Sequence, residues 1–195
     1  MELILVRHAE PVPGKVSSGS SADPSLSERG ARQAADVAKW LARGALQRVI
    51  SSPALRSRST AMPCAERAGL EIDVDDRLRD ASAGGAEYVP LEVDKARNPA
   101  AYRARVADYL ESPRLADLSG RVNEALDEWC AQCHGQRIAV FCHGSVINVF
   151  ASRILGLAPS AFLEAGYASG HRFMISRTGV RSVLSLNETA FLTSE

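Results

Sequence analysis

The chain has 195 residues, enough for one well-buried domain and short for two. Its 23 basic and 23 acidic side chains balance, which argues against a general binder of nucleic acids or of anionic membranes. No apolar run approaches the roughly 18 residues of a membrane span, and the acidic start Met1-Glu2-Leu3 does not resemble a signal peptide. The four cysteines do not suggest a disulfide framework. We expect a cytoplasmic protein without nucleic-acid or membrane partners, and homodimer formation is left open.

The first half of the chain alternates between strand and helix patterns. Apolar or alternating segments predict three strands, over 3–6, 48–51 and 71–74. A polar loop over 14–25 precedes a helix over 27–43, for which Ser27 is the expected N-cap and Gly44 the expected stop. A second helix begins near Pro53, and Pro63 predicts that it kinks or ends near Ala61 because proline lacks a backbone donor.

The second half begins with the stretch 81–118, in which the Asn98-Pro99 pair marks the start of a helix that carries Tyr102 and Val106. Further helices are expected over about 119–133 and 145–155. Three strands are expected over 138–142, 172–177 and 181–186, the last two joined by Thr178-Gly179.

Strands that alternate with helices predict an α/β fold, a three-layer αβα sandwich with a mainly parallel central sheet and a C-terminal antiparallel strand pair. We interpret residues 1–195 as a single domain with an insert or lid region at about 81–118. In such sheets ligands bind beyond the carboxyl ends of the strands. The residues that follow each strand are therefore the first candidates for a site.

Charged and imidazole side chains follow four of the predicted strands. They are Arg7, His8, Arg56, Asp80 and His143. Arginine can grip two phosphoryl oxygens at once, and a neutral histidine nitrogen can attack phosphorus to form a phosphohistidine. A carboxyl group can protonate the leaving oxygen. Each residue alone has a structural explanation, but together they predict a centre for phosphoryl transfer.

These residues lie in motifs that resemble the histidine phosphatase superfamily, the phosphoglycerate-mutase-like group. The motifs follow the family's order and run to the tail of the chain: Leu5-Val6-Arg7-His8-Ala9-Glu10, residues 23–34, residues 51–61, Phe141-Cys142-His143-Gly144 and Leu186-Asn187-Glu188-Thr189-Ala190. In the third motif a Thr-Ala pair follows the phosphate-binding arginine by four residues, which selects Arg56 over Arg58.

The resemblance implies a role for each residue of the predicted centre. His8 becomes the phosphorylated nucleophile, and Arg7, Arg56 and His143 bind the phosphoryl oxygens. Asp80 falls where the family usually places a glutamate as proton donor. No metal and no organic cofactor is implied.

Three departures from the family pattern bear on these roles. Ala9 replaces the usual glycine after the nucleophile. Asp80 is one methylene shorter than glutamate and lacks the segment often found beyond it, so Glu87 and Glu92 are alternative proton donors. Many members also have an asparagine a few residues after the nucleophile; either nothing replaces it here, or one of three residues does: Lys15, Ser17 or Ser18.

The sequence favours hydrolysis of a small phosphorylated metabolite. Family mutases are typically longer, with extra segments that close over the site, whereas this chain has only the insert at 81–118. Substrate selection is expected there, from Tyr88, Arg97, Tyr102 and Arg103. Sugar phosphates, nucleotide-like esters and a protein phosphohistidine are all compatible. The alternatives are a phosphoglycerate-mutase-type phosphoryl transferase and a non-catalytic phosphate-binding scaffold that has lost its acid.

Overall fold

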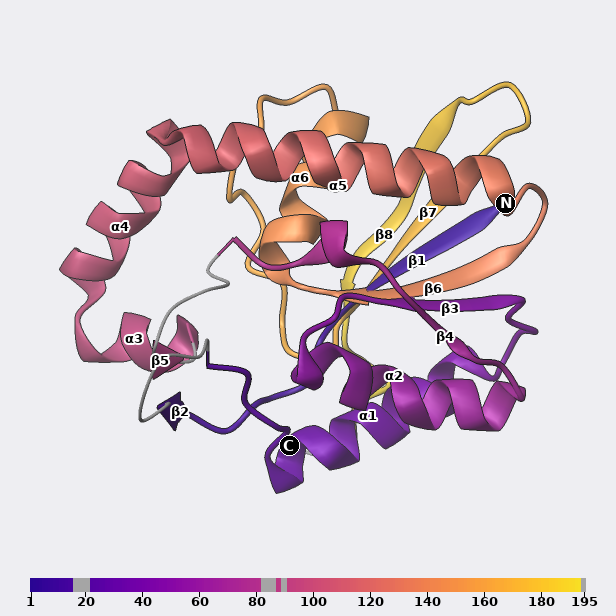
Figure 1. The fold of residues 1–195 in the computed structure, drawn as a ribbon, viewed down its shortest axis with the longest axis horizontal. Coiled ribbons are helices and arrows are strands. Elements are labelled where there is room, and N and C mark those ends of the chain that lie inside the picture. Colours follow the sequence, from indigo (N-terminus) through magenta and orange to yellow (C-terminus); the bar gives the residue numbers. More distant parts are fainter. Residues whose placement is uncertain (16–21, 82–86, 89–90, 194–195) are drawn as a thin grey trace.

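The computed structural model describes residues 1–15, 22–81, 87–88 and 91–193. Its centre is a six-stranded sheet in the order β4-β3-β6-β1-β7-β8 (Figure 1). The strands are β1 (Glu2–Arg7), β3 (Arg48–Ser51), β4 (Ile72–Val74), β6 (Arg137–Cys142), β7 (Gly170–Ile175) and β8 (Arg181–Glu188). The first four run parallel, whereas β7 is antiparallel to β1 and β8 is antiparallel to β7. The expected mainly parallel sheet with an antiparallel C-terminal pair is confirmed.

Helices cover both faces of this sheet (Figure 1). One layer holds α1 (Glu28–Leu41) and α2 (Leu55–Ala68), and the other holds α5 (Pro113–Gln132) and α6 (Gly144–Ile154). To one side of the sandwich lie four short or exposed elements: β2 (Gly14–Lys15), β5 (Glu87–Tyr88), α3 (Leu91–Arg97) and α4 (Pro99–Glu111). The three-layer αβα architecture follows directly from this arrangement.

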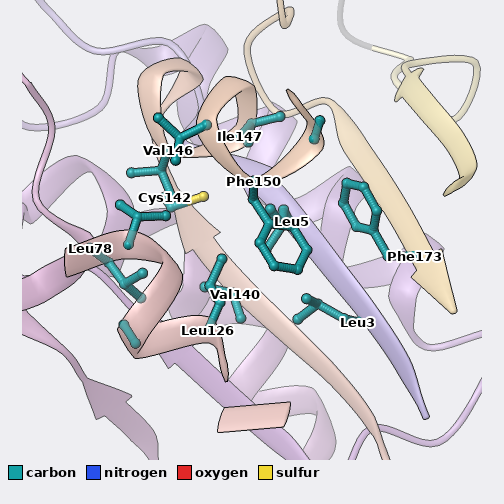
Figure 2. Packing of buried hydrophobic residues seen from close by; sticks show 14 of the residues in the cluster. Leu3, Leu5, Leu78, Leu126, Val140, Cys142, Val146, Ile147, Phe150 and Phe173 are labelled. Carbon is teal, nitrogen blue, oxygen red and sulfur yellow. The ribbon is translucent and has the colours of Figure 1, made fainter. Parts of the chain in front are cut away.

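The burial of the central strand β1 on both faces explains why its sequence is continuously apolar. Leu3 and Leu5 point into the cluster shared with α5 and α6, where Phe150 and Phe173 meet edge to face with ring centroids 5.2 Å apart (Figure 2). The alternate residues of the strand belong to the cluster formed with α1 and α2. Because successive strand residues point to opposite faces, a strand buried on both faces is apolar at every position.

Two predicted helix starts are confirmed by their caps. The hydroxyl of Ser27 accepts from the backbone N–H of Gly30 over 2.9 Å at the start of α1. The side chain of Asn98 accepts from the N–H of Ala101 over 3.1 Å, with proline as the first residue of α4. In both places a side-chain oxygen satisfies a backbone donor that has no partner within the helix.

Two expected helix bounds were wrong. Pro63 does not end α2 near Ala61, because the helix continues to Ala68 and is capped by Gly69, whose φ is 66°. The proline removes one backbone donor, but the helix keeps its buried face of small side chains against the sheet, which outweighs that loss. The helix expected from residue 119 begins earlier, at Pro113, because Leu115 and Leu118 extend the apolar face of α5.

Several elements were not predicted: the short strands β2 and β5, the helix α3 and a 3₁₀ turn η1 (Asp76–Leu78). They are two to seven residues long, too short for a hydrophobic period to be recognised. In the described part of the chain, no helix combines the length and the apolar character needed to cross a membrane.

Candidate active site

The carboxyl ends of the parallel strands bring the predicted residues together. Arg7 ends β1 and His8 follows it, while His143 follows β6 and lies with its ring centroid 5.3 Å from that of His8. Arg56, from the first turn of α2, places a guanidinium nitrogen 3.4 Å from His143 and 3.7 Å from the carboxylate of Asp80. All five predicted side chains therefore form one continuous group.

His8 is buried and is held in a single tautomer. Its Nδ1 lies 2.9 Å from the carbonyl oxygen of Ala9. A carbonyl can only accept, so Nδ1 carries the proton and Nε2 carries the lone pair. Burial, and then electrostatic interactions with His143, Arg7 and Arg56, hold the pKa of His8 well below 6.5. The ring is neutral around pH 7, with one nitrogen available for attack.

The backbone around His8 is fixed from three sides. Its own N–H donates to the carbonyl of Cys142 over 2.9 Å, and its carbonyl accepts from Ala168 over 3.2 Å. The next N–H, that of Ala9, donates to the hydroxyl of Thr60 over 2.9 Å. That hydroxyl in turn donates to the carbonyl of Arg56 over 2.7 Å. Thr60 therefore links the backbone that follows His8 to the first turn of α2, which carries Arg56.

His143 is fully buried between Ser52 and Arg56. Its Nε2 lies 2.8 Å from Ser52 Oγ, and its Nδ1 accepts from the guanidinium of Arg56. Burial is the main reason that its pKa falls to about 3; the Asp80 carboxylate opposes this shift, and three arginines, Arg56, Arg7 and Arg121, add to it. A guanidinium can only donate, so in this arrangement Nδ1 carries the lone pair and Nε2 donates its proton to Ser52 Oγ.

Arg7 is 6% exposed and is held by three groups from two other segments, α3 and the loop before β7. One guanidinium nitrogen donates to the carbonyl of Ala165 over 2.5 Å and to Glu92 Oε1 over 2.7 Å. The centre of the guanidinium also lies 4.0 Å from the ring centroid of Tyr167, within the range of a cation–π interaction. The guanidinium is therefore held by protein groups at the end of β1, directly before His8, rather than solvated.

Arg56 is 4% exposed and faces two carboxylates at a longer range. It lies 3.7 Å from Asp23 and 3.7 Å from Asp80. Asp23 also accepts from the backbone N–H of Leu55 at the start of α2, over 2.8 and 3.0 Å. The chain segment before α1 thus closes over the start of α2 and fixes the guanidinium's position.

Asp80 lies at the edge of the group, with its side chain 20% exposed. One of its oxygens accepts from the hydroxyl of Ser145 over 2.6 Å and from the N–H of Ala81 over 2.8 Å. The other oxygen faces Arg56. The aspartate therefore reaches the arginine that belongs to the predicted phosphoryl site, although it is shorter than a glutamate.

The alternative acids occupy different positions. Glu92 is paired with Arg7, and although burial alone raises the pKa of this carboxyl, the charge and hydrogen bond of Arg7 outweigh burial and lower it. A carboxyl held in its charged form is a poor proton donor. Glu87 lies in β5, and its side chain is outside the part of the chain that the structure describes.

The remaining candidates from the sequence lie on β2, β5, α3 and α4 or outside the described residues. Lys15 belongs to β2, whereas Ser17 and Ser18 lie outside the described residues. Tyr88 is in β5, Arg97 ends α3, and the α4 residues Tyr102 and Arg103 are half-buried and exposed, respectively.

Four contributors to the site were missed by the sequence analysis: Ser52, Thr60, Ser145 and Tyr167. The first two lie inside the quoted arginine motif, and Ser145 lies one residue beyond the second histidine motif, so their proximity to the site had a signal in the sequence. Tyr167 lies in a loop before β7 with no such signal, and only the fold brings its ring beside Arg7 and His8.

Comparison with known proteins gives a match across most of the chain. The family model of the histidine phosphatase superfamily (branch 1) matches residues 3–189. Phosphoserine phosphatase 1 of Hydrogenobacter thermophilus is 31% identical over 199 residues, covering 98% of this chain and 94% of that protein. A probable phosphoglycerate mutase of Erwinia tasmaniensis is 29% identical over 169 residues, covering 83% of this chain and 78% of that protein.

Solved structures share the fold at lower sequence identity. A mycobacterial glucosyl-3-phosphoglycerate phosphatase superposes with a TM-score of 0.78 at 22% identity, covering 96% of this chain and 99% of that one. A phosphoserine phosphatase from Entamoeba histolytica superposes with a TM-score of 0.76 at 22% identity, covering 98% of both chains. With the family model and the Hydrogenobacter relative, the conclusion is that this chain belongs to the histidine phosphatase superfamily.

Proposed function

We propose that this protein hydrolyses the phosphate monoester of a small metabolite, with His8 as the nucleophile. The observation that carries the proposal is the state of His8: a buried, neutral imidazole whose Nδ1 donates to the carbonyl of Ala9. That hydrogen bond directs the Nε2 lone pair away from the backbone. Buried arginines on both sides supply the positive charge that a phosphoryl group requires.

The proposed reaction has two balanced steps. In the first, His8 Nε2 forms a bond to phosphorus while the bond from phosphorus to the ester oxygen breaks, and Asp80 gives its proton to that oxygen. In the second, water attacks phosphorus, its proton goes to Asp80, and the N–P bond breaks to release phosphate. The carboxyl group ends as it began, and the net change is ester plus water to alcohol plus phosphate.

Arg7, Arg56 and His143 are the proposed ligands of the phosphoryl oxygens. The two guanidiniums remain charged throughout, so they offset the charge that spreads over those oxygens in the transition state. In the described structure Nδ1 of His143 accepts from the guanidinium of Arg56, so His143 would donate to a phosphoryl oxygen through Nδ1 after its proton moves there from Nε2. Its proton can move between the two ring nitrogens because Ser52 Oγ can donate to Nε2 as well as accept from it.

The substrate class is suggested by the relatives with the higher identities. Phosphoserine and phosphoglycerate, named in the Hydrogenobacter and Erwinia proteins, are both phosphate esters of small carboxylic acids. We propose a substrate of this kind. The insert at 81–118, which contains α3 and α4, is the proposed lid over the ester's alcohol part.

A phosphoryl transferase of the mutase type is the second candidate, favoured by the 29% identity to a probable phosphoglycerate mutase. The two functions differ only in what attacks the phosphohistidine, water or a substrate hydroxyl. Incubation with 3-phosphoglycerate separates them, because a hydrolase releases inorganic phosphate whereas a mutase forms 2-phosphoglycerate without phosphate release.

The central test is turnover of a panel of phosphate esters by the wild type, His8→Ala and His134→Ala. His134 is exposed on the surface and serves as the matched histidine control. We expect phosphate release, vanadate inhibition and an acid-labile phosphoenzyme from the wild type and the control, with loss of all three in His8→Ala. If the wild type neither turns over nor becomes phosphorylated by any ester, the scaffold alternative holds instead.

A further inference from the structure

The carboxylate of Asp80 is held by a hydroxyl from another element. Ser145 is the second residue of α6 and follows His143 and Gly144. Its Oγ donates to Asp80 Oδ1 over 2.6 Å and accepts from the N–H of Ala81 at 3.4 Å. A distance of 2.6 Å lies in the range of charge-assisted hydrogen bonds between a hydroxyl and a carboxylate.

The two oxygens of Asp80 therefore have different surroundings. Oδ1 accepts from the hydroxyl of Ser145 and from the N–H of Ala81. Oδ2 lies 3.7 Å from the guanidinium of Arg56, on the side of the proposed phosphoryl group. Because Oδ1 already receives two donors, a proton on the carboxyl group is better placed on Oδ2.

The backbone that carries Asp80 is also clamped. Arg121 of α5 donates to the carbonyl of Arg77 over 2.6 Å and to that of Arg79 over 2.8 Å. Between them, Leu78 is fully buried in the cluster formed with α5 and α6 (Figure 2). The segment therefore cannot swing freely, and the short aspartate side chain is brought within reach of Arg56.

We propose that Ser145 is a positioning residue for Asp80. Its hydroxyl fixes the carboxyl group with Oδ2 toward the leaving oxygen of the substrate and keeps the exchanged proton off Oδ1. The inference rests on the proposed function, in which Asp80 is the group that exchanges this proton. Loss of the hydroxyl would both misdirect the carboxyl group and remove a hydrogen bond that favours its charged form.

The titratable and charged groups that interact with Asp80 come from several elements: Arg56 of α2, Tyr109 of α4, Cys142 of β6 and His143 before α6. Burial, with a contribution from Asp80, raises the pKa of the Tyr109 hydroxyl and of the Cys142 thiol, and Arg56 remains charged. The pKa of His143 is about 3. Between about pH 5 and 8 these neighbours therefore keep one charge state.

The test uses a series of aryl phosphates whose leaving phenols range from p-nitrophenol to p-methylphenol. A proton donor matters little for p-nitrophenol and much for the more basic p-methylphenol. The variants are Ser145→Ala, Ser145→Thr, which keeps the hydroxyl, and Asp80→Asn. The control is Ser152→Ala, a buried serine of α6 whose hydroxyl has no hydrogen-bond partner in the described part of the chain.

We expect Ser145→Ala to lower kcat about tenfold for the p-methylphenyl ester and less than about twofold for the p-nitrophenyl ester. The basic limb of its kcat/KM profile, above which Asp80 no longer holds a proton, should move to higher pH. Ser145→Thr should restore both properties, Asp80→Asn should show the steepest dependence on the leaving group, and Ser152→Ala should behave like the wild type.

Three results would overturn the inference, and they differ in whether the proposed function fails with it. If Asp80→Asn steepens the series but Ser145→Ala matches the wild type in slope and pH profile, Ser145 has no positioning role and the proposed function is untouched. If Asp80→Asn itself leaves the dependence of kcat on the leaving phenol unchanged, the proton donor is another group. The roles assigned to Asp80 and to Ser145 are then both wrong. An equal fall in kcat for every aryl phosphate in Ser145→Ala would also show that Ser145 does not act through Asp80.

Discussion

The guanidinium of Arg7 and the carboxylate of Glu92 form an ion pair with a nitrogen–oxygen distance of 2.7 Å. Arg7 is nearly inaccessible, whereas the side chain of Glu92 is 48% exposed and belongs to α3 of the insert. The pair thus joins the insert to the arginine that we assign to the phosphoryl group. In the free protein a carboxylate takes up one of the donors that an incoming phosphate would use.

Replacing Glu92 by glutamine should therefore strengthen the binding of inorganic phosphate. The expected gain is small, about threefold in the inhibition constant, because a half-exposed ion pair contributes only about 0.2–1 kcal/mol. The control is Asp94→Asn in the same helix, since Asp94 pairs with Arg105 instead of Arg7. A fall in kcat as large as that of Asp80→Asn would identify Glu92 as the proton donor and contradict our assignment.

Gly30 should not tolerate substitution, because the start of α1 packs against the backbone of Glu10, two residues after His8. A Cβ built at Gly30 would lie 2.0 Å from the carbonyl oxygen of Glu10. Gly30→Ala should therefore destabilise the protein by about 2 kcal/mol or more. At Gly120 in α5 a Cβ has no neighbour within 4 Å, so Gly120→Ala should stabilise the protein by about 0.5–1 kcal/mol.

Urea unfolding of the two alanine variants measures this difference. Equal stabilities would show that the start of α1 moves away from Glu10 at little cost. The comparison also gives a physical reason for the glycine in the Ser27-Glu28-Arg29-Gly30 stretch, which the sequence alone presents only as part of a motif.

The site residues that directly follow a buried strand, Arg7, His8 and His143, could be predicted from the local sequence. The apolar run before Arg7-His8 shows a buried strand, and a side chain that follows a parallel strand lies at the ligand-binding edge. The same reasoning placed His143 after β6. The early helix end predicted at Pro63 does not occur, because the burial of α2 against the sheet, which the local sequence does not report, stabilises the helix beyond the proline.

The supporting contacts could not be derived in the same way. Thr60 meets the N–H of Ala9 across 51 positions, and Ser145 meets Asp80 across 65. Such pairs form only if the register of the strands and the first residue of each helix are right to within one residue. Hydrophobic patterns do not define these positions so closely. The assignment of Asp80 rested on the family pattern, and the contacts with Ser145 and Arg56 add a geometric reason for it.

Thr60 should be required for both stability and turnover. Thr60→Val keeps the shape of the side chain but leaves the buried N–H of Ala9 without its acceptor, at a cost of about 1–3 kcal/mol. Ala9 also supplies the carbonyl that sets the tautomer of His8, so we expect kcat to fall by about tenfold or more. Thr60→Ser retains the hydroxyl and should keep most of the activity. A fully active Thr60→Val would show that the loop is held well enough by its other hydrogen bonds.

The buried histidines predict how stability depends on pH. His171, on β7, lies between the hydroxyl of Ser169 and the N–H of Asn187, and burial lowers its pKa to about 4. Burial likewise lowers the pKa of His143 to about 3 and that of His8 well below 6.5. In the unfolded chain each ring takes up a proton near pH 6.5, whereas in the folded protein it stays neutral.

The unfolded state therefore binds more protons than the folded state below pH 6.5. Stability should be complete above this pH and should fall as the pH is lowered toward 4, by up to about 1.4 kcal/mol per pH unit for each histidine. Urea unfolding between pH 7.5 and 5 measures the slope before most carboxylates protonate. His171→Asn should be less stable at pH 7.5 but lose stability less steeply, whereas His134→Asn, at an exposed position, should keep the wild-type slope. An unchanged slope in His171→Asn would mean that His171 is protonated in the folded protein, in which case its ring could not accept the N–H of Asn187 as the structure shows.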